Sequence, residues 1–259
     1  EDAIDILRAA LLVAKLDNDE LDIPAYLKQI DRMVAEVRDA FPKDASADVR
    51  LKALNKYLFD QNGFHGSRTD YYHRANSYLD RVIDDREGLP ITLSVLYMEL
   101  ARRLDLTVVG VGLPAHFVVR HEPKEKPSQL IDVFDRGKLL SRDDADKLVR
   151  ELTGEPLEEE HLAAYSKRQI IRRILQNLIG VAQRADDREA MLGYVEAVVA
   201  IEPDDIQNRG LRAVMRFQTG RRAAALADLD WILDKRPEGI DMDELRAMRE
   251  HFATAPLPK

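Results

Sequence analysis

The stretch REGLPITLSVLYMELARR, residues 86–103, decides the fold. Its leucines recur at steps of three and four residues, which is the spacing of one face of an α-helix. Pro90 suits the first helical position, because its ring fixes φ and its missing N–H would have no partner there. We therefore expect a largely buried helix of about four turns that begins at Pro90.

The first turn of this helix is a position where chemistry can be placed. Its N–H groups and the positive end of the helix dipole favour an anion and lower the pKa of a thiol. Here the residue is a proline, and the chain contains no cysteine. Disulfides, thiolate zinc sites and cysteine nucleophiles are therefore excluded.

Composition places the chain among ordinary globular proteins. It has 259 residues, of which 45% are hydrophobic and 33% charged, enough for one or two domains. The formal charge of −8 opposes nonspecific binding to nucleic acids or acidic membranes. Because the sequence shows neither an apolar run of about 20 residues nor a signal-peptide pattern, we predict a cytoplasmic protein.

Before the central helix, apolar stripes predict further helices. Two of them fall within residues 1–47, and a third begins at Asp48 and ends at Asn62-Gly63, a turn pair. An ordered loop rich in tyrosine follows. Ser77 with Asp80 three residues later resembles a capping box, which marks the start of another helix.

After the central helix the hydrophobic period changes from 3.6 to 2. Residues 107–114, 115–122 and 129–134 are short runs rich in valine, isoleucine and phenylalanine, separated by turns that contain proline. They predict an antiparallel sheet packed on the helix. We expect Gly137 to close the sheet and a polar stretch to lead away from it.

The C-terminal part contains an internal repeat. Pro203 and Pro237 are 34 residues apart, the period of a tetratricopeptide repeat, and the apolar residues that precede them correspond. Asp186 and Gly220 fall at the turns between paired helices. The pattern predicts two helical hairpins and a final capping helix near Met242–Phe252.

Seven short motifs resemble one family, the SirB-type transglutaminase-like proteins of bacteria, which carry tetratricopeptide repeats at the C-terminus. The resemblance implies an α+β fold: a degenerate transglutaminase- and papain-like domain of helices with a small antiparallel sheet, then an α-helical repeat region. The motifs are Asn62-Gly63-Phe64, Asp70-Tyr71-Tyr72, Asn76–Leu79, Gly88–Ser94, Ala101–Leu104, Pro114–Phe117 and Ile131-Asp132.

With this resemblance we expect four parts of the chain. They are N-terminal helices packing on the core at 1–47, a transglutaminase-like domain at 48–150, a linker at 151–165 and tetratricopeptide-repeat-like helices at 166–259.

The resemblance also implies a catalytic triad with one member missing. Pro90 occupies the position of the cysteine, His116 that of the histidine and Asp132 that of the aspartate. The same comparison leads us to expect glycine where Ala115 and Asp105 stand. Without the nucleophile, covalent acyl transfer is lost.

Each remaining site residue has two interpretations. His116 and Asp132 form either an oriented general base that activates water or a buried polar contact between two strands. Thr92 and Ser94, the hydroxyls within about one turn of Pro90, are either weak nucleophile candidates or ordinary packing residues.

Two groups of side chains are candidates for binding. Tyr71, Tyr72, Asn76 and Pro90 are expected to line a groove beside the helix start, although packing of the loop explains them equally well. Arg209, Arg212 and Arg216 share one helix face and are expected to hold acidic peptides; a solvated face paired with nearby acids is the alternative.

No metal-binding spacing such as HExxH occurs, so we expect no metal and no cofactor. The leading hypothesis is a noncatalytic pseudoenzyme that binds a protein or peptide partner through its groove and repeats, with no nucleic-acid or membrane partner. The alternative is a hydrolase or amidase of peptide-like substrates in which His116 and Asp132 activate water or a hydroxyl. A third hypothesis is a structural adaptor whose groove is filled by its own side chains.

Overall fold

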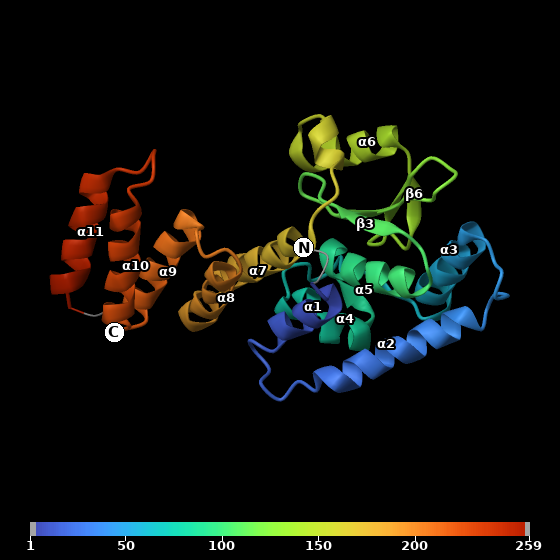
Figure 1. Ribbon diagram of the computed structural model, residues 1–259, viewed down its shortest axis with the longest axis horizontal. Coiled ribbons are helices and arrows are strands. Elements are labelled where there is room, and N and C mark those ends of the chain that lie inside the picture. Colours follow the sequence, from blue (N-terminus) through green and yellow to red (C-terminus); the bar gives the residue numbers. More distant parts are fainter. Residues whose placement is uncertain (1–3, 257–259) are drawn as a thin grey trace. The chain divides into compact units, whose positions relative to one another are not determined.

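A computed structural model of the protein describes residues 4–256, which form two compact units. The first unit runs to Ile174 and the second begins at Leu175. Figure 1 shows helices packed around a small sheet in the first and helices alone in the second. No helix within residues 4–256 combines the length and the apolar character needed to span a membrane.

Helix α5 (Pro90–Arg103) is the centre of the first unit. Every residue from Pro90 to Ala101 is buried, and Pro90 occupies the first turn as expected. The helix is buried on all sides because elements surround it. Those in contact with it include α1 (Ile6–Ala14), α2 (Ile23–Arg38), α3 (Ala47–Asn55), α4 (Leu79–Asp85) and two strands of the sheet.

The sheet has four antiparallel strands in chain order: β3 (Val108–Val111), β4 (Val118–His121), β5 (Gln129–Asp132) and β6 (Lys138–Leu140). It lies between α5 and α6 (Arg142–Thr153) (Figure 1). The strand β6 was not expected. Gly137 does not end the sheet. Instead, its φ of 75° helps turn the chain back onto β5.

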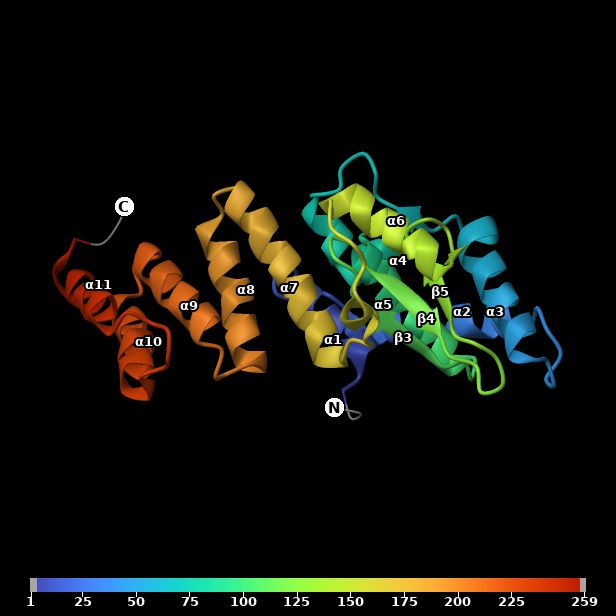
Figure 2. The ribbon, with the colours of Figure 1, turned by 90° about the horizontal axis from the view of Figure 1, so that it is seen from above.

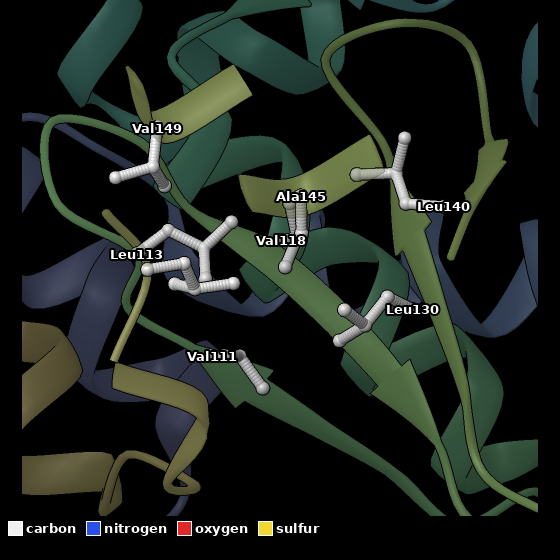
Figure 3. Close-up of a cluster of buried hydrophobic side chains, with 8 residues drawn as sticks. Val111, Leu113, Val118, Leu130, Leu140, Ala145 and Val149 are labelled. Carbon is white, nitrogen blue, oxygen red and sulfur yellow. The ribbon is translucent and has the colours of Figure 1, made fainter. Parts of the chain in front are cut away.

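A cluster of buried aliphatic side chains joins the sheet to α6 (Figure 3). Leu157 belongs to this cluster, Leu162 packs against it, and Ala164 bridges to Val111. The segment 151–165, expected to be a linker, is therefore part of the first unit and contains the 3-10 helix η3 (Glu159–Leu162).

Short irregular elements connect α3 to α5. They are a π-helix η1 (Lys56–Gln61), a 3-10 helix η2 (Arg74–Ser77) and two parallel two-residue strands, β1 (His65–Gly66) and β2 (Glu87–Gly88). The expected capping box does not form. Helix α4 begins after Tyr78, and the Ser77 hydroxyl and Asp80 Oδ1 are buried without a hydrogen-bond partner among the described residues.

The second unit is a series of helices that follow one another along the chain (Figure 2). Helix α7 (Lys167–Arg184) begins before the boundary at Ile174, and α8 (Arg188–Ile201), α9 (Ile206–Gln218), α10 (Arg222–Lys235) and α11 (Met242–Thr254) follow. The turns at Asp186 and Gly220 have φ values of 51° and 82°, as the repeat pattern predicts for turn positions. In the α11 cap, Phe252 stacks on Phe217 with ring centroids 4.1 Å apart.

Candidate functional site

The candidate site is built around a buried His116–Asp132 pair. His116 lies two residues before β4 and Asp132 ends β5, so the neighbouring strands bring them together. Nε2 of His116 lies 3.0 Å from Oδ2 of Asp132, and the residues are only 8% and 5% exposed. An ionised carboxylate only accepts hydrogen bonds, so Nε2 donates, and in the neutral ring the lone pair is on Nδ1.

Local backbone contacts fix the orientation of this pair. Oδ1 of Asp132 accepts the main-chain N–H groups of Phe134 at 3.0 Å and Asp135 at 3.2 Å, which leaves Oδ2 for the ring. The backbone carbonyl of His116 accepts a hydrogen bond from Arg173 at 2.8 Å. Asp132 therefore orients the ring, and Arg173 holds the backbone of the same residue. No residue in 4–256 hydrogen-bonds to Nδ1 of His116.

The chain reaches His116 through a strained turn. Ala115 has a φ of 57°, as does Asp105 at the end of α5. These are the two positions at which the family resemblance predicts glycine. A side chain in this left-handed conformation costs roughly 1–2 kcal/mol. The turn geometry expected for glycine is thus kept at both positions despite the change of residue.

Three aromatic side chains, which we call the aromatic ledge, lead from His116 to the surface. The Phe134 ring meets the His116 ring edge-on at 5.9 Å, Tyr71 meets Phe134 at 6.2 Å, and Tyr72 meets Tyr71 at 5.2 Å. Tyr71 is 38% and Tyr72 59% exposed. Partial burial raises the pKa of the Tyr71 hydroxyl, and Tyr72 adds to the shift while Arg173 opposes it.

Gly66 and Arg68 position the innermost ring of the ledge. The Gly66 N–H donates to the Phe134 carbonyl at 3.1 Å, and a Cβ on Gly66 would lie 2.2 Å from the Phe134 ring. The ring therefore packs directly on the glycine backbone. Arg68 lies over the same ring at 5.4 Å and pairs with Asp135 at 2.9 Å, which adds a cation beside the ledge.

The start of α5 is closed by internal hydrogen bonds. The Thr92 hydroxyl donates to the Asn76 carbonyl at 2.7 Å, and the Ser94 hydroxyl donates to the Pro90 carbonyl at 2.7 Å. The Asn76 side chain donates to the Asp70 carbonyl at 2.7 Å. Both hydroxyls are buried and neither hydrogen-bonds to His116. Thr92 and Asn76 tie the tyrosine loop to the helix start, whereas the Ser94 bond lies within α5.

The three arginines expected to hold a partner lie in the second unit and point inward. Arg209, Arg212 and Arg216 all pair with the buried carboxylate of Asp228, at 3.3, 2.5 and 2.9 Å. Arg216 also pairs with Glu196 at 2.8 Å. The pairing with nearby acids that the alternative expected is therefore present, but the side chains are only 14–18% exposed, so the face is not solvated.

The structure adds residues that sequence reasoning did not select. Phe134 had a signal, since it follows Asp132 by two residues at the end of the same predicted strand. Arg68 and Arg173 had none, because nothing in the spacing of a loop or a later helix indicates contact with a strand. Within the part of the chain that the structure describes, no cluster of three histidine, aspartate or glutamate side chains has the arrangement of a metal site.

Comparisons with known proteins agree with this architecture. Residues 24–176 match the family model of the transglutaminase-like superfamily, and residues 178–250 match a tetratricopeptide repeat model. No solved structure matches.

Curated relatives cover most of the chain. A UPF0162 protein of Xylella fastidiosa is 32% identical, over 95% of this chain and 89% of its own length. Protein SirB1 of Salmonella typhimurium is 28% identical over 88% of this chain and 86% of its own. Human F-box only protein 21 is 28% identical over 66% of this chain, which is 28% of its own length. The chain therefore belongs to the transglutaminase-like superfamily, and it carries tetratricopeptide repeats after that domain, as the SirB-type resemblance implied.

Proposed function

We propose that the protein is a noncatalytic binding module that holds a peptide segment of a partner protein against His116 and the aromatic ledge. One observation carries the proposal. The position expected for the nucleophile is Pro90, and the two hydroxyls nearest to it along α5 are buried and donate to backbone carbonyls. The site retains an ordered ring and exposed aromatics but has no group to form an acyl intermediate.

The chemistry of the ledge fits a peptide ligand. Exposed tyrosines offer rigid apolar area together with hydroxyl groups, a combination enriched at interfaces. Arg68 lies over the Phe134 ring of the ledge, and Arg173, which donates to the His116 carbonyl, opposes the pKa shift of Tyr71. We therefore expect a segment with an aromatic or proline residue.

The repeats provide a second interaction surface in this proposal. Tetratricopeptide repeats generally mediate protein–protein interactions. Arg209, Arg212 and Arg216 remain a prediction for partner contact, but each already shares Asp228. An acidic residue of a partner would therefore bind to arginines that are already paired with Asp228.

Site-specific photo-crosslinking tests the proposal. A photoreactive amino acid replaces Tyr72 in one protein and Leu12, which is 52% exposed on α1, in the matched control. Peptides from a random octapeptide library that cross-link only at position 72 are synthesised and titrated. We expect Tyr71→Ala to weaken them about threefold to tenfold, the effect of losing an aromatic contact. His116→Gln, which keeps a donor for Asp132, should change affinity less than twofold.

A second candidate function is water-activated hydrolysis of amide or ester bonds. It is favoured by the His116 ring, which Asp132 orients through Nε2 and whose Nδ1 has no hydrogen-bond partner among residues 4–256. The selected peptides therefore also serve as substrates in an assay by mass spectrometry. Cleavage by the wild-type protein that disappears with His116→Gln would establish this function and overturn the noncatalytic proposal.

A further inference from the structure

The outer edge of β3 exposes main-chain groups that the fold leaves unused. Alternate residues of a strand point their N–H and C=O to opposite sides. The Thr107 carbonyl accepts from Glu122 on the β4 side, at 2.9 Å, whereas the Gly110 carbonyl accepts from Tyr165 on the outer side, at 2.9 Å. Val108 therefore also points outward, and its N–H and C=O have no hydrogen-bond partner within residues 4–256.

Among residues 4–256, the contacts along this edge cover only one of its ends. The bridge between Val111 and Ala164 occupies the last part of β3, and the chain then leaves the edge to begin α7. Natural edge strands are usually protected by charged residues, proline or a covering loop. Here the uncovered positions are Val108 and Val109, two half-buried valines.

A groove of about 440 Å³ runs beside this edge. Its buried apolar side chains include Met98, Leu106 and Ile170, which come from three separate segments of the first unit. Arg102 and Lys167 also line it. Arg102 pairs with the buried Glu99, which also lines the groove, but the Arg102 side chain is 66% exposed, and Arg103 pairs with both Glu99 and Asp31.

We propose that the β3 edge and this groove bind an extended segment of a partner protein by strand addition. The segment carries apolar side chains at alternate positions and an acidic residue beside them. Val108 supplies the main-chain hydrogen bonds, and the period of two in an extended chain directs every second side chain into the groove. The cationic lining selects the acidic residue. A helical ligand has no free N–H groups for such pairing. The inference concerns a surface separate from His116 and the aromatic ledge.

A phage selection with paired variants tests the inference. Random twelve-residue peptides are selected on the wild-type protein and then titrated against Val108→Pro and Val108→Thr. Proline removes the outward N–H, which makes no ladder bond, whereas threonine keeps it at nearly the same size. We expect peptides with alternating apolar residues and an acid, whose affinity falls about tenfold in Val108→Pro and less than twofold in Val108→Thr.

Two measurements keep the result interpretable if Val108→Pro misfolds. N-methylation of single peptide residues should abolish binding at alternate positions only. The Val108 amide should gain protection from hydrogen exchange when the peptide is bound. Selected peptides that bind Val108→Pro as well as wild type, or that tolerate every N-methylation, would overturn the inference. So would self-association of the protein that Val108→Pro abolishes in sedimentation experiments, because the occupant would then be a second copy.

Discussion

Each unit contains a buried aspartate, Asp132 in the first and Asp228 in the second, and the two carboxylates are satisfied by different kinds of partner. Asp132 receives a single ring nitrogen and two backbone N–H groups, and the ring that it orients contacts Phe134 at the inner end of the aromatic ledge. Asp228 receives three arginines, whose guanidinium groups turn away from solvent to reach it. One acid orients a ring beside the ledge, and the other closes a structural cluster.

Residue type and spacing alone therefore do not tell whether charged residues form a functional site or a structural ion cluster. Both groups contain a carboxylate and nitrogen donors, and both drew attention in the sequence. What separates them is the number of cations per acid and the direction in which they point. The three arginines around Asp228 depend on its carboxylate, because removing one partner of a buried ion pair leaves the other charge uncompensated.

The largest expected effect is the loss of Asp228. Asp228→Asn leaves Arg209 and Arg212 without a carboxylate while Arg216 keeps Glu196, so we expect the second unit to lose about 3–5 kcal/mol of unfolding free energy. Urea unfolding followed by circular dichroism measures it. Asp230→Asn is the matched control on the same helix, where a half-exposed pair with Arg249 contributes less than about 1 kcal/mol. Equal losses in the two variants would contradict the closed cluster.

A smaller loss is expected at Asp132. Asp132→Ala removes the partner of His116 and of two backbone N–H groups, at a cost of about 1–3 kcal/mol to the first unit. Asp135→Ala, which breaks only surface pairs with Arg68 and Lys138, is the control and should cost under about 1 kcal/mol. If Asp132→Ala costs more than Asp228→Asn, the contrast between the two acids fails.

The strained turn beside His116 predicts a gain. Ala115→Gly relieves a side chain held at a φ of 57°, so we expect the first unit to become about 1 kcal/mol more stable. The same substitution at the exposed helical residue Ala35 should cost about 1 kcal/mol, because glycine is unfavourable within a helix. Opposite signs in urea unfolding are the diagnostic result, and a loss at both positions would contradict the strain.

The smallest effect concerns pH and His121 on β4. Burial lowers the pKa of this ring, and Asp48 only partly opposes the shift. Below pH 6.5, the ordinary pKa of histidine, His121 binds a proton in the unfolded chain but stays neutral in the folded protein. The free energy of unfolding therefore falls as the pH decreases from 6.5 toward the pKa of the folded state. The slope is below about 1.4 kcal/mol per pH unit. Subtracting the profile of His121→Gln isolates it; an unchanged profile would contradict the burial.

Much of the fold could be predicted because it rests on local patterns. The leucine stripe and Pro90 predicted α5, the valine-rich runs predicted β3 to β5, and the spacing of two prolines predicted the repeats. Strand β6 was missed because it has only three residues, two of them exposed. It also follows Gly137, a residue type that usually marks the end of a sheet region.

The candidate site was predicted only in part, and from the family resemblance rather than from a local pattern. The resemblance indicated His116 and Asp132, and neighbouring strands bring them together. Arg173 could not be predicted, since its contact with His116 joins residues 57 positions apart. The inward turn of the three arginines depends on Asp228 in the next helix, and helical spacing alone does not say which face is covered.

In our proposal, the His116 site binds a peptide without cleaving it. The most direct measurement titrates one peptide, selected by cross-linking at position 72, against wild type, Tyr71→Ala and His116→Gln while mass spectrometry follows its integrity. We predict an intact peptide throughout, weaker binding to Tyr71→Ala and nearly unchanged binding to His116→Gln. Cleavage by wild type that His116→Gln abolishes would contradict the account.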